Sequence, residues 1–275
     1  MRVALITGCS KPDGIGWSTA LALAASGAAV VVSDIVGRAK ESSAAPQPEG
    51  GLARLVGMIK SAGGTCASVC GDVSREDDAA RMVEFSVQQF GQLDILVNNA
   101  AAPHGGDRND IEQIPLAAWE QIMAVNVRGV FLMARAAVPH MRKNRWGRIV
   151  NVASALARYG GRGKSPYAAS KGAVIAFSRS LAMDVAGDGI TVNCVCPGSV
   201  LTSRALSTTG KLFGAENIEQ GLISRAQEIP AGRHGTPEDI AASIAFLCSE
   251  AAGYITGSDL FVDGGGLPIP ASRNP

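Results

Sequence analysis

The chain of 275 residues has a formal net charge of +1, and only 18% of its residues are charged. A composition this close to neutral lacks the excess of positive charge that binds nucleic acids or anionic membranes. A small-molecule partner is therefore expected, with no nucleic acid and no membrane. No uninterrupted apolar run approaches the ~20 residues of a membrane-spanning helix. The start MRVALITGCS resembles a strand rather than a signal peptide, which predicts a cytoplasmic protein. The length suits one α/β domain over residues 1–275.

Short apolar runs alternate with helical patterns along most of the chain. Strands are expected at residues 2–7, 28–34, 65–71, 93–98, 148–153, 190–196 and 259–262. Helices are expected at residues 15–27, 52–62, 75–90, about 116–142, 166–186 and 237–249. The strands are continuously apolar, which is typical of parallel sheets covered on both faces. The pattern predicts an α/β doubly wound fold with a seven-stranded parallel sheet flanked by helices.

Two segments interrupt this alternation. Residues 35–51 contain ESSAAPQPEGG, whose prolines and paired glycines disfavour a continuous helix, so an inserted loop is expected there. Residues 199–229 are rich in Ser, Thr and Gly before one short amphipathic helix. A weakly structured segment of this length often covers a ligand, which predicts a substrate lid. An ordinary surface excursion is the alternative.

The cysteines predict packing rather than chemistry. They form no Cys-x-x-Cys pair, and no histidine stands near them at metal-ligand spacing, so no metal is expected. Four of them lie in the strand-like runs TCASVC and TVNCVC, where small apolar thiols pack well. Buried, reduced side chains are therefore expected for Cys9, Cys66, Cys70, Cys194, Cys196 and Cys248.

A glycine-rich turn, TGCSKPDGIG at residues 7–16, stands between the first strand and the first helix. Glycines in this position let the backbone approach a pyrophosphate at the positive end of a helix. Asp34 closes the second strand 18 residues after Gly16, where a carboxylate can bind both ribose hydroxyls and repel a 2'-phosphate. NAD is therefore expected rather than NADP, although Lys11 argues weakly the other way. A turn cap is the alternative role for Asp34.

The stretch from Ser154 to Lys171, SALARYGGRGKSPYAASK, has the strongest chemical pattern. Tyr167 and Lys171 are four residues apart, so on a helix their side chains share one face. The ammonium favours a phenolate, which suits Tyr167 as a general acid/base, while Ser154 is placed to hold a substrate oxygen. A chance pair on the protein surface is the alternative.

Together these segments resemble the short-chain dehydrogenase/reductase family, and the resemblance runs over nearly the whole chain. The glycine turn is similar to the family's Thr-Gly-x-x-x-Gly-x-Gly, although five residues separate Gly8 from Gly14 and make the loop two residues longer. Further motifs in the family's order are Asp72-Val73, Asn98-Asn99-Ala100-Ala101, Pro197-Gly198-Ser199-Val200-Leu201-Thr202, the run from Arg233 to Asp239, and Val262-Asp263-Gly264-Gly265. The resemblance implies a Rossmann-type fold with bound NAD.

The resemblance also implies four catalytic residues: Asn126, Ser154, Tyr167 and Lys171. Tyr167 would take the proton of the substrate hydroxyl or return it, and Ser154 would hydrogen-bond the developing carbonyl oxygen. Lys171 would favour the Tyr167 phenolate and bind the nicotinamide ribose. Asn126 would stand mid-helix, where its side chain competes with backbone bonding and opens the helix for a water linking Lys171 to solvent. A helix-surface amide is its alternative role.

The residues expected to contact the cofactor share a position at or near the carboxyl end of a predicted strand, or belong to the Tyr-x-x-x-Lys pair. They are Gly8, Ser10, Gly14, Ile15, Gly16, Asp34, Ile35, Asp72, Val73, Asn99, Ala100, Tyr167, Lys171, Pro197, Val200 and Thr202. A backbone amide near Val200 and the Thr202 hydroxyl are expected to contact the carboxamide of nicotinamide and the phosphate.

The leading functional prediction is an NAD-dependent oxidoreductase that interconverts a secondary alcohol and a ketone. An enoyl reductase of the same fold is one alternative, disfavoured because those enzymes space tyrosine and lysine more widely. A catalytically silent NAD-binding regulator is the other, although it would be free to lose catalytic side chains that are all present here. The family resemblance implies a homotetramer, with contacts through helices 116–142 and 166–186. The tail after Gly266 either crosses a subunit boundary or is disordered.

Substrate choice is expected to depend on Ala155, Leu156, Tyr159 and residues 203–229, which are mostly small or apolar. Three cations, Arg158, Arg162 and Lys164, lie among glycines just before the tyrosine. They suggest either an electropositive rim for an anionic substrate or a solvated loop.

Overall fold

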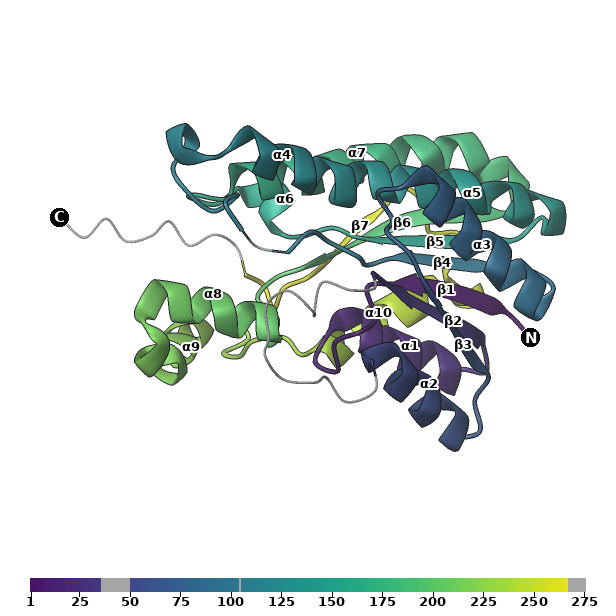
Figure 1. The fold of residues 1–275 in the computed structure, drawn as a ribbon, viewed down its shortest axis with the longest axis horizontal. Coiled ribbons are helices and arrows are strands. Elements are labelled where there is room, and N and C mark those ends of the chain that lie inside the picture. The colour runs from purple at the N-terminus through teal and green to yellow at the C-terminus, as the bar shows by residue number, and fades with distance from the viewer. Residues whose placement is uncertain (36–49, 104, 267–275) are drawn as a thin grey trace.

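A seven-stranded, all-parallel sheet organises the molecule, in the order β3-β2-β1-β4-β5-β6-β7 (Figure 1). The computed structural model describes residues 1–35, 50–103 and 105–266 of the chain. The strands are β1 (Val3–Thr7), β2 (Ala29–Asp34), β3 (Cys66–Cys70), β4 (Ile95–Asn98), β5 (Gly147–Val152), β6 (Ile190–Pro197) and β7 (Asp259–Val262). The predicted doubly wound α/β fold is confirmed, with each strand within two residues of its expected bounds.

Helices cover both faces of this sheet (Figure 1). On one face lie α1 (Ile15–Ala25), α2 (Gly51–Ser61) and α10 (Pro237–Leu247). On the other lie α3 (Glu76–Phe90), α4 (Leu116–Met123), α5 (Gly129–Asn144) and α7 (Ser165–Val185). The strand order reverses between β1 and β4, and in such sheets ligands bind at the carboxyl ends of the strands beside this reversal.

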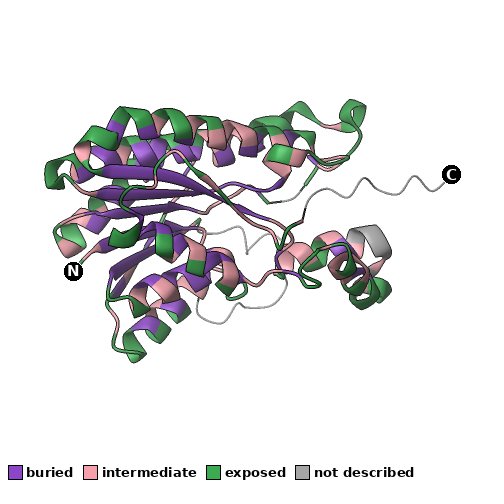
Figure 2. Ribbon diagram, turned by 180° about the vertical axis from the view of Figure 1, so that it is seen from behind, coloured by how far each residue is buried: buried purple, intermediate pink, exposed green. Residues whose placement is uncertain are grey.

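Strand β1 shows how the sheet divides the core. Ala4 and Ile6 pack on the side of Ile244 from α10, whereas Leu5 packs on the side of Met133 from α5. All five residues of the strand are buried, as the interior of Figure 2 shows for the central strands. A strand buried on both faces has no solvent-facing side, so its residues do not alternate between apolar and polar, which explains the apolar runs in the sequence.

The first and last thirds of the chain meet where α1 packs against α10. Ser18 of α1 donates a hydrogen bond to the carboxylate of Glu238 at 2.7 Å. Helix α10 begins with a capping box, in which Thr236 and Asp239 each bond the other's backbone N–H. Arg233 adds a bidentate ion pair to Asp239, with nitrogen–oxygen distances of 2.6 and 3.1 Å. These contacts fix the helix that closes one face of the sheet.

The long helix expected at residues 116–142 is interrupted. A π-helical turn, Ala124–Arg128, separates α4 from α5 and carries Asn126 in its middle. Residues 116–144 are long and apolar enough to cross a membrane by length and composition alone. Half of an apolar 18-residue window within this stretch is buried inside the protein.

The predicted lid contains two helices instead of one, α8 (Ser203–Phe213) and α9 (Ile218–Gln227). They project from one end of the sheet in Figure 1. A short helix that the sequence did not suggest, α6 (Leu156–Tyr159), follows β5. Most of the expected inserted loop, residues 36–49, and the tail, residues 267–275, lie outside the described residues.

Five of the six cysteines are buried as expected, and all six are free thiols. The prediction is wrong for Cys70, which is exposed. It is the last residue of β3, and β3 forms an edge of the sheet, so the covering layer ends there.

Candidate active site

The glycine loop and the segment after β4 are bound together where the strand order reverses. Thr7 Oγ1 accepts hydrogen bonds from the backbone N–H of Asn99 at 3.1 Å and of Ala100 at 3.0 Å. Asn99 Nδ2 donates in turn to the carbonyl oxygens of Thr7 at 2.8 Å and Gly8 at 2.9 Å. The Asn99 side chain therefore holds the glycine loop in place through its hydrogen bonds to the backbone of Thr7 and Gly8.

Two glycines in this loop fill spaces that no side chain can share. A methyl group added at Gly16 would lie 2.5 Å from Asn99 Nδ2 and 2.5 Å from the Gly8 carbonyl oxygen. Gly8 has a φ of +75°, and a methyl group there would lie 2.9 Å from Ala100 Cα. Helix α1 begins at Ile15 and includes Gly16, so the first N–H groups of the helix face the loop. Bare backbone at a helix N-terminus fits the pyrophosphate of a dinucleotide.

The extra length of the glycine loop forms an exposed turn. Residues 11–13 are exposed, and the backbone N–H of Gly14 closes the turn on the Lys11 carbonyl oxygen at 2.9 Å. The Asp13 carboxylate accepts a hydrogen bond from the backbone N–H of Ser203, the first residue of α8. The additional residues thus connect the glycine loop to the predicted lid.

Asp34 lies beside the same loop at the end of β2. Its Oδ2 accepts a hydrogen bond from the Ser10 N–H, and its Oδ1 accepts one from the Ile35 N–H, both at 2.8 Å. The side chain is partly exposed, so the carboxylate both anchors the glycine loop and remains accessible to a ligand. Asp34, Ser10 and Ile35, predicted separately as cofactor residues, are in direct contact.

The predicted adenine-side pair Asp72 and Val73 follows β3. Asp72 Oδ1 accepts hydrogen bonds from both the N–H and the hydroxyl of Ser74, at 2.9 and 2.7 Å. Val73 is buried, and a methyl group added at Gly129 would lie 2.8 Å from its Cγ2. Asp72 is therefore held in a turn, and Val73 packs on the start of α5.

The segment after β6 carries the other predicted cofactor residues. Pro197 ends the strand and is buried, and Val200 forms an isolated parallel bridge with Gly235. The hydroxyl of Thr202 accepts a hydrogen bond from the Ala205 N–H at 3.3 Å and caps α8. Thr202 therefore sets the start of the predicted lid, a role that the sequence did not suggest.

Asn126 links the segment after β4 to α7. Its Oδ1 accepts a hydrogen bond from the Ala102 N–H at 2.9 Å, and its Nδ2 donates to Ser170 Oγ at 3.0 Å. Ser170 donates onward to the Tyr167 carbonyl oxygen at 2.8 Å. The π-helical turn places this amide inward, because the widened backbone turns the side chain into the protein core. The expected opening of the helix at Asn126 is confirmed, and the alternative of a surface amide is wrong.

Tyr167 and Lys171 lie on one face of α7, as predicted. The Lys171 ammonium is 5.9 Å from the centroid of the Tyr167 ring, and its side chain is only 3% exposed. Burial lowers the pKa of Lys171 below its usual range, and Arg204 adds to this effect, whereas negative charge on Tyr167 opposes it. For the pKa of Lys171, burial therefore outweighs the opposing effect of Tyr167.

Ser154 is brought to the same place by Lys171. The ammonium donates a hydrogen bond to the Val152 carbonyl oxygen at 2.6 Å, which ties α7 to the carboxyl end of β5. Ser154 stands two residues further along, is 8% exposed, and its Oγ accepts a hydrogen bond from the Leu156 N–H at 3.2 Å. Because its oxygen accepts this bond, the Ser154 hydroxyl can donate its proton to a substrate oxygen.

Three arginines that the sequence did not single out lie on the segments near Tyr167 and Lys171. The Arg108 guanidinium lies 5.5 Å from the Tyr167 ring centroid. Arg204 donates to the Ala102 carbonyl oxygen at 3.1 Å, and Arg225 donates to Thr209 at 2.9 Å. They are 96 and 117 residues apart from Arg108 in the sequence, so only the fold brings them together.

The three cations proposed as a rim separate in the structure. Arg158 lies 5.6 Å from the Tyr159 ring centroid and 5.3 Å from the Phe261 ring centroid, next to β7. Arg162 is exposed. Lys164 alone is partly buried, because its side chain folds against the loop at Gly161, where an added methyl group would lie 3.2 Å from Lys164 Cδ.

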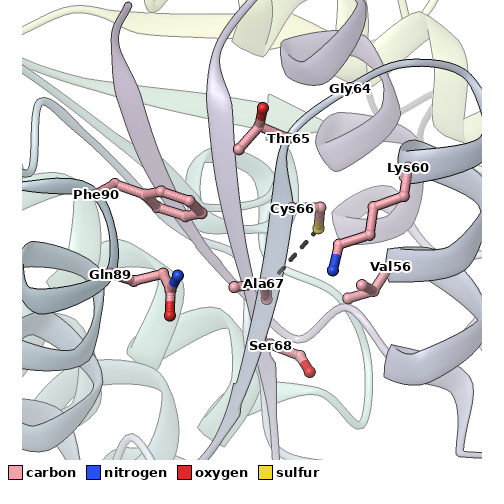
Figure 3. A pocket seen from close by; sticks show the side chains of 9 residues that line it. All are labelled: Val56, Lys60, Gly64, Thr65, Cys66, Ala67, Ser68, Gln89 and Phe90. Carbon is pink, nitrogen blue, oxygen red and sulfur yellow. Dashed lines mark hydrogen bonds between the residues drawn. The ribbon is translucent and has the colours of Figure 1, made fainter.

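A hollow away from these residues lies along the outer edge of β3 (Figure 3). Its lining includes Val56 and Lys60 from α2 and Gln89 and Phe90 from α3. The dashed contact in the view joins Cys66 to the Ala67 carbonyl oxygen at 3.7 Å. None of the predicted site residues lines this hollow, and it lies at the sheet edge rather than at the order reversal.

Comparison with known proteins decides the family. The family model described as Enoyl-(Acyl carrier protein) reductase matches residues 8–266. An uncharacterized oxidoreductase of Thermotoga maritima is 38% identical over 270 residues, which is 98% of each chain. The chain belongs to the short-chain dehydrogenase/reductase family.

Two further members of the short-chain dehydrogenase/reductase family have described activities. A 3-oxoacyl-(acyl-carrier-protein) reductase of Synechocystis is 36% identical over 266 residues, 96% of each chain. The crystal structure of actinorhodin polyketide ketoreductase with NADPH matches with a TM-score of 0.86 and 30% identity, covering 96% of this chain and 97% of that one. Family membership makes the protein an oxidoreductase whose partner is a small molecule.

Proposed function

We propose that the protein is an NAD-dependent oxidoreductase that interconverts a secondary alcohol and a ketone. The observation that carries the proposal is the buried Lys171 ammonium beside Tyr167, tied through Val152 to the strand that leads to Ser154. A general acid/base must be held in a fixed position, and a neighbouring positive charge favours its deprotonated form. Helix α7 fixes the position of Tyr167, and the Lys171 ammonium supplies the positive charge. The catalytic set of the proposal is Asn126, Ser154, Tyr167 and Lys171.

Each of these residues has a separate task. Tyr167 takes the proton from the substrate hydroxyl at its phenol oxygen, or returns it in the reduction direction. Ser154 donates a hydrogen bond to the substrate oxygen, and Lys171 stabilises the phenolate. Asn126 holds α7 in position through Ser170. The bound nicotinamide supplies the hydride donor or acceptor.

NAD is proposed over NADP because of Asp34. Two backbone N–H groups fix its carboxylate at the end of β2, where a negative charge would repel a 2'-phosphate. The related ketoreductase structure contains NADPH, so membership of the family alone does not select the cofactor. The bare glycine backbone at α1 fits the pyrophosphate of either dinucleotide.

The experiment is a steady-state screen of secondary alcohols with NAD and of ketones with NADH, followed at the nicotinamide absorbance. Turnover that disappears in Tyr167→Phe supports the proposal. An enoyl thioester is included in the screen because the matching family model bears the name of an enoyl reductase. Reduction of the thioester without turnover of any alcohol or ketone would refute the proposal.

The remaining elements of the proposal concern assembly and location. We take residues 1–275 as one domain with residues 199–229 as its lid, acting in the cytoplasm as a homotetramer. Large apolar side chains on the helices proposed as contacts support the assembly, because Leu116, Phe131 and Met183 are 72%, 42% and 83% exposed. Size-exclusion chromatography with light scattering tests the tetramer.

A further inference from the structure

We propose that the substrate carries an anionic group, such as a carboxylate, and that a cluster of four cations beside Tyr167 binds it. The cluster consists of Arg108, Lys164, Arg204 and Arg225. This inference rests on the proposed function, since it names the substrate class of the same site. It replaces the rim of three cations that the sequence suggested.

The cluster is assembled from the segment after β4, the residue before α7, and helices α8 and α9. The Arg108 guanidinium faces the Tyr167 ring from the segment after β4. Lys164 immediately precedes α7, the helix on which Tyr167 stands. The two segments touch, because a methyl group added at Gly163 would lie 3.6 Å from the Asn109 carbonyl oxygen.

The other two cations come from the predicted lid. Arg204, on the first turn of α8, donates hydrogen bonds to the carbonyl oxygens of Ala101 and Ala102. The backbone N–H of Ala102 donates in turn to Asn126. Arg225, on α9, is held by Thr209 at 2.9 Å. The lid therefore presents its positive charges toward the segment that leads to the catalytic residues.

Electrostatic coupling between the cations supports this placement. Burial lowers the pKa of Lys164, and the positive charges of Arg108 and Arg225 lower it further. Arg204 acts in the same direction on Lys171 and on Arg108. These effects relate Lys164 to Arg108 and Arg225, and Arg108 to Arg204, in agreement with the contacts between their segments.

The charge of the cluster is poorly balanced within the chain. Asp107 lies 3.7 Å from Arg108, but over the described ranges no carboxylate lies within 4.0 Å of Lys164, Arg204 or Arg225. Asp13 of the glycine loop contacts the lid, but its carboxylate accepts the backbone N–H of Ser203. Partly buried cations that outnumber the neighbouring carboxylates are unfavourable, and a bound anion relieves their repulsion. Enzymes use such uncompensated charge to attract and orient charged substrates.

The pyrophosphate of the cofactor is the other anion that such a cluster could bind. It is the less suitable occupant, because the glycine backbone at Gly8 and Gly16 already forms its cradle at the start of α1. Arg108 and Lys164 lie instead with Tyr167, where the substrate reacts. A direct measurement of NADH affinity in the variants separates the two anions.

The test compares keto acids with their neutral amides, which have nearly the same shape. The pairs are levulinate with levulinamide and 4-acetylbenzoate with 4-acetylbenzamide, at saturating NADH. We expect kcat/KM for the acid to exceed that for the amide by roughly tenfold, the size of one charge-assisted hydrogen bond. Isothermal titration of the same compounds into the enzyme–NADH complex gives a preference that does not depend on turnover.

Lys164→Gln is the decisive variant. Arg162→Gln is its control, because it removes one positive charge from the same loop at a residue that is exposed. Lys164→Gln should lower the acid-to-amide ratio by about fivefold, while Arg162→Gln leaves it within about twofold. NADH affinity should be unchanged in both. Loss of NADH affinity in Lys164→Gln would assign the cluster to the cofactor and overturn the inference.

The outcomes also separate this inference from the proposed function. Equal turnover and equal binding of acids and amides would overturn the anionic substrate and leave the ketone reductase in place. Tighter binding of the acids, weakened by Lys164→Gln but without reduction of any ketone, would support the anion site and refute the proposed function.

Discussion

Gly16 and Asn99 share one small space at the point where β1 and β4 diverge. The carboxamide of Asn99 occupies the volume that a Gly16 side chain would need, and the same carboxamide holds the glycine loop through Thr7 and Gly8. A change at one residue therefore disturbs the support that the other gives to the loop.

Gly16→Ala should abolish dinucleotide binding and destabilise the fold. The added methyl group would lie 2.5 Å from two atoms, so the loop must move, and such overpacking costs roughly 1–3 kcal/mol. Cofactor titration and urea unfolding provide the measurements. Gly172→Ala is the control, because nothing lies within 4 Å of a methyl group there and alanine favours helix α7. Normal cofactor affinity in Gly16→Ala would contradict the cradle.

Tyr167→Phe should lose turnover by about 10²- to 10⁴-fold, the usual contribution of a general acid/base, and keep its NAD affinity. The substitution removes one oxygen and leaves the ring in contact with Arg108 and Lys171. Tyr254→Phe makes the same chemical change at a fully exposed residue and should leave turnover unchanged. Near-normal rates in Tyr167→Phe would remove this residue from the mechanism.

Asp34→Ala should weaken NAD binding and reduce the preference for NAD over NADP. The same change also releases the Ser10 N–H, so some loss of affinity is expected for both cofactors. Asp34→Asn separates the two effects, because it keeps a hydrogen-bond acceptor and removes the charge that repels a 2'-phosphate. Dissociation constants for both cofactors decide the question, and an unchanged ratio in both variants would refute the role of Asp34.

Asp239→Asn should destabilise the protein in a manner that depends on pH. The hydrogen bond from Arg233 chiefly lowers the pKa of Asp239 to about 2 from a usual value of 3.8. A carboxyl with a lowered pKa stabilises the fold above its unfolded pKa, and this contribution disappears as the pH falls toward the folded value. The gap between wild type and Asp239→Asn should therefore be constant from about pH 7 to 5 and shrink below about pH 4.

Urea unfolding of both proteins across this pH range measures the gap. Solvent screens this exposed ion pair, so we expect the gap in unfolding free energy to be small. Arg233→Gln provides the control, because Asp239→Asn in that background should show little further loss of stability. A gap that persists unchanged at low pH would show that the charge of Asp239 does not contribute.

The sheet could be predicted from sequence because its strands are buried on both faces. The runs VALI and AVVV within β1 and β2 have no polar interruption, and the helices between the strands set their parallel direction. The glycine loop was predictable for the same reason, since its glycines stand between a strand and a helix. Local pattern and tertiary structure agree at these positions.

Other features depend on contacts between distant segments. The π-helical turn at Asn126 follows from the bonds of its amide to Ala102 and Ser170, which lie 24 and 44 residues away. The cation cluster was missed because Arg108, Arg204 and Arg225 are isolated charges in unrelated sequence contexts. Conversely, Arg158 was expected at the site because it is near Tyr167 in sequence, but its ring contacts draw it toward β7.

The hydrogen bond between Ser18 and Glu238 joins residues 220 positions apart, and Asp13 reaches Ser203 across 190 positions. A ribosome therefore releases the glycine loop long before the helices that complete its surroundings are synthesised. The early half of the sheet therefore lacks α10, which packs on the side of Ala4 and Ile6, until the last third of the chain is synthesised. On refolding, helical circular dichroism should recover before dinucleotide binding does, because the cofactor site forms only once both ends of the chain have met.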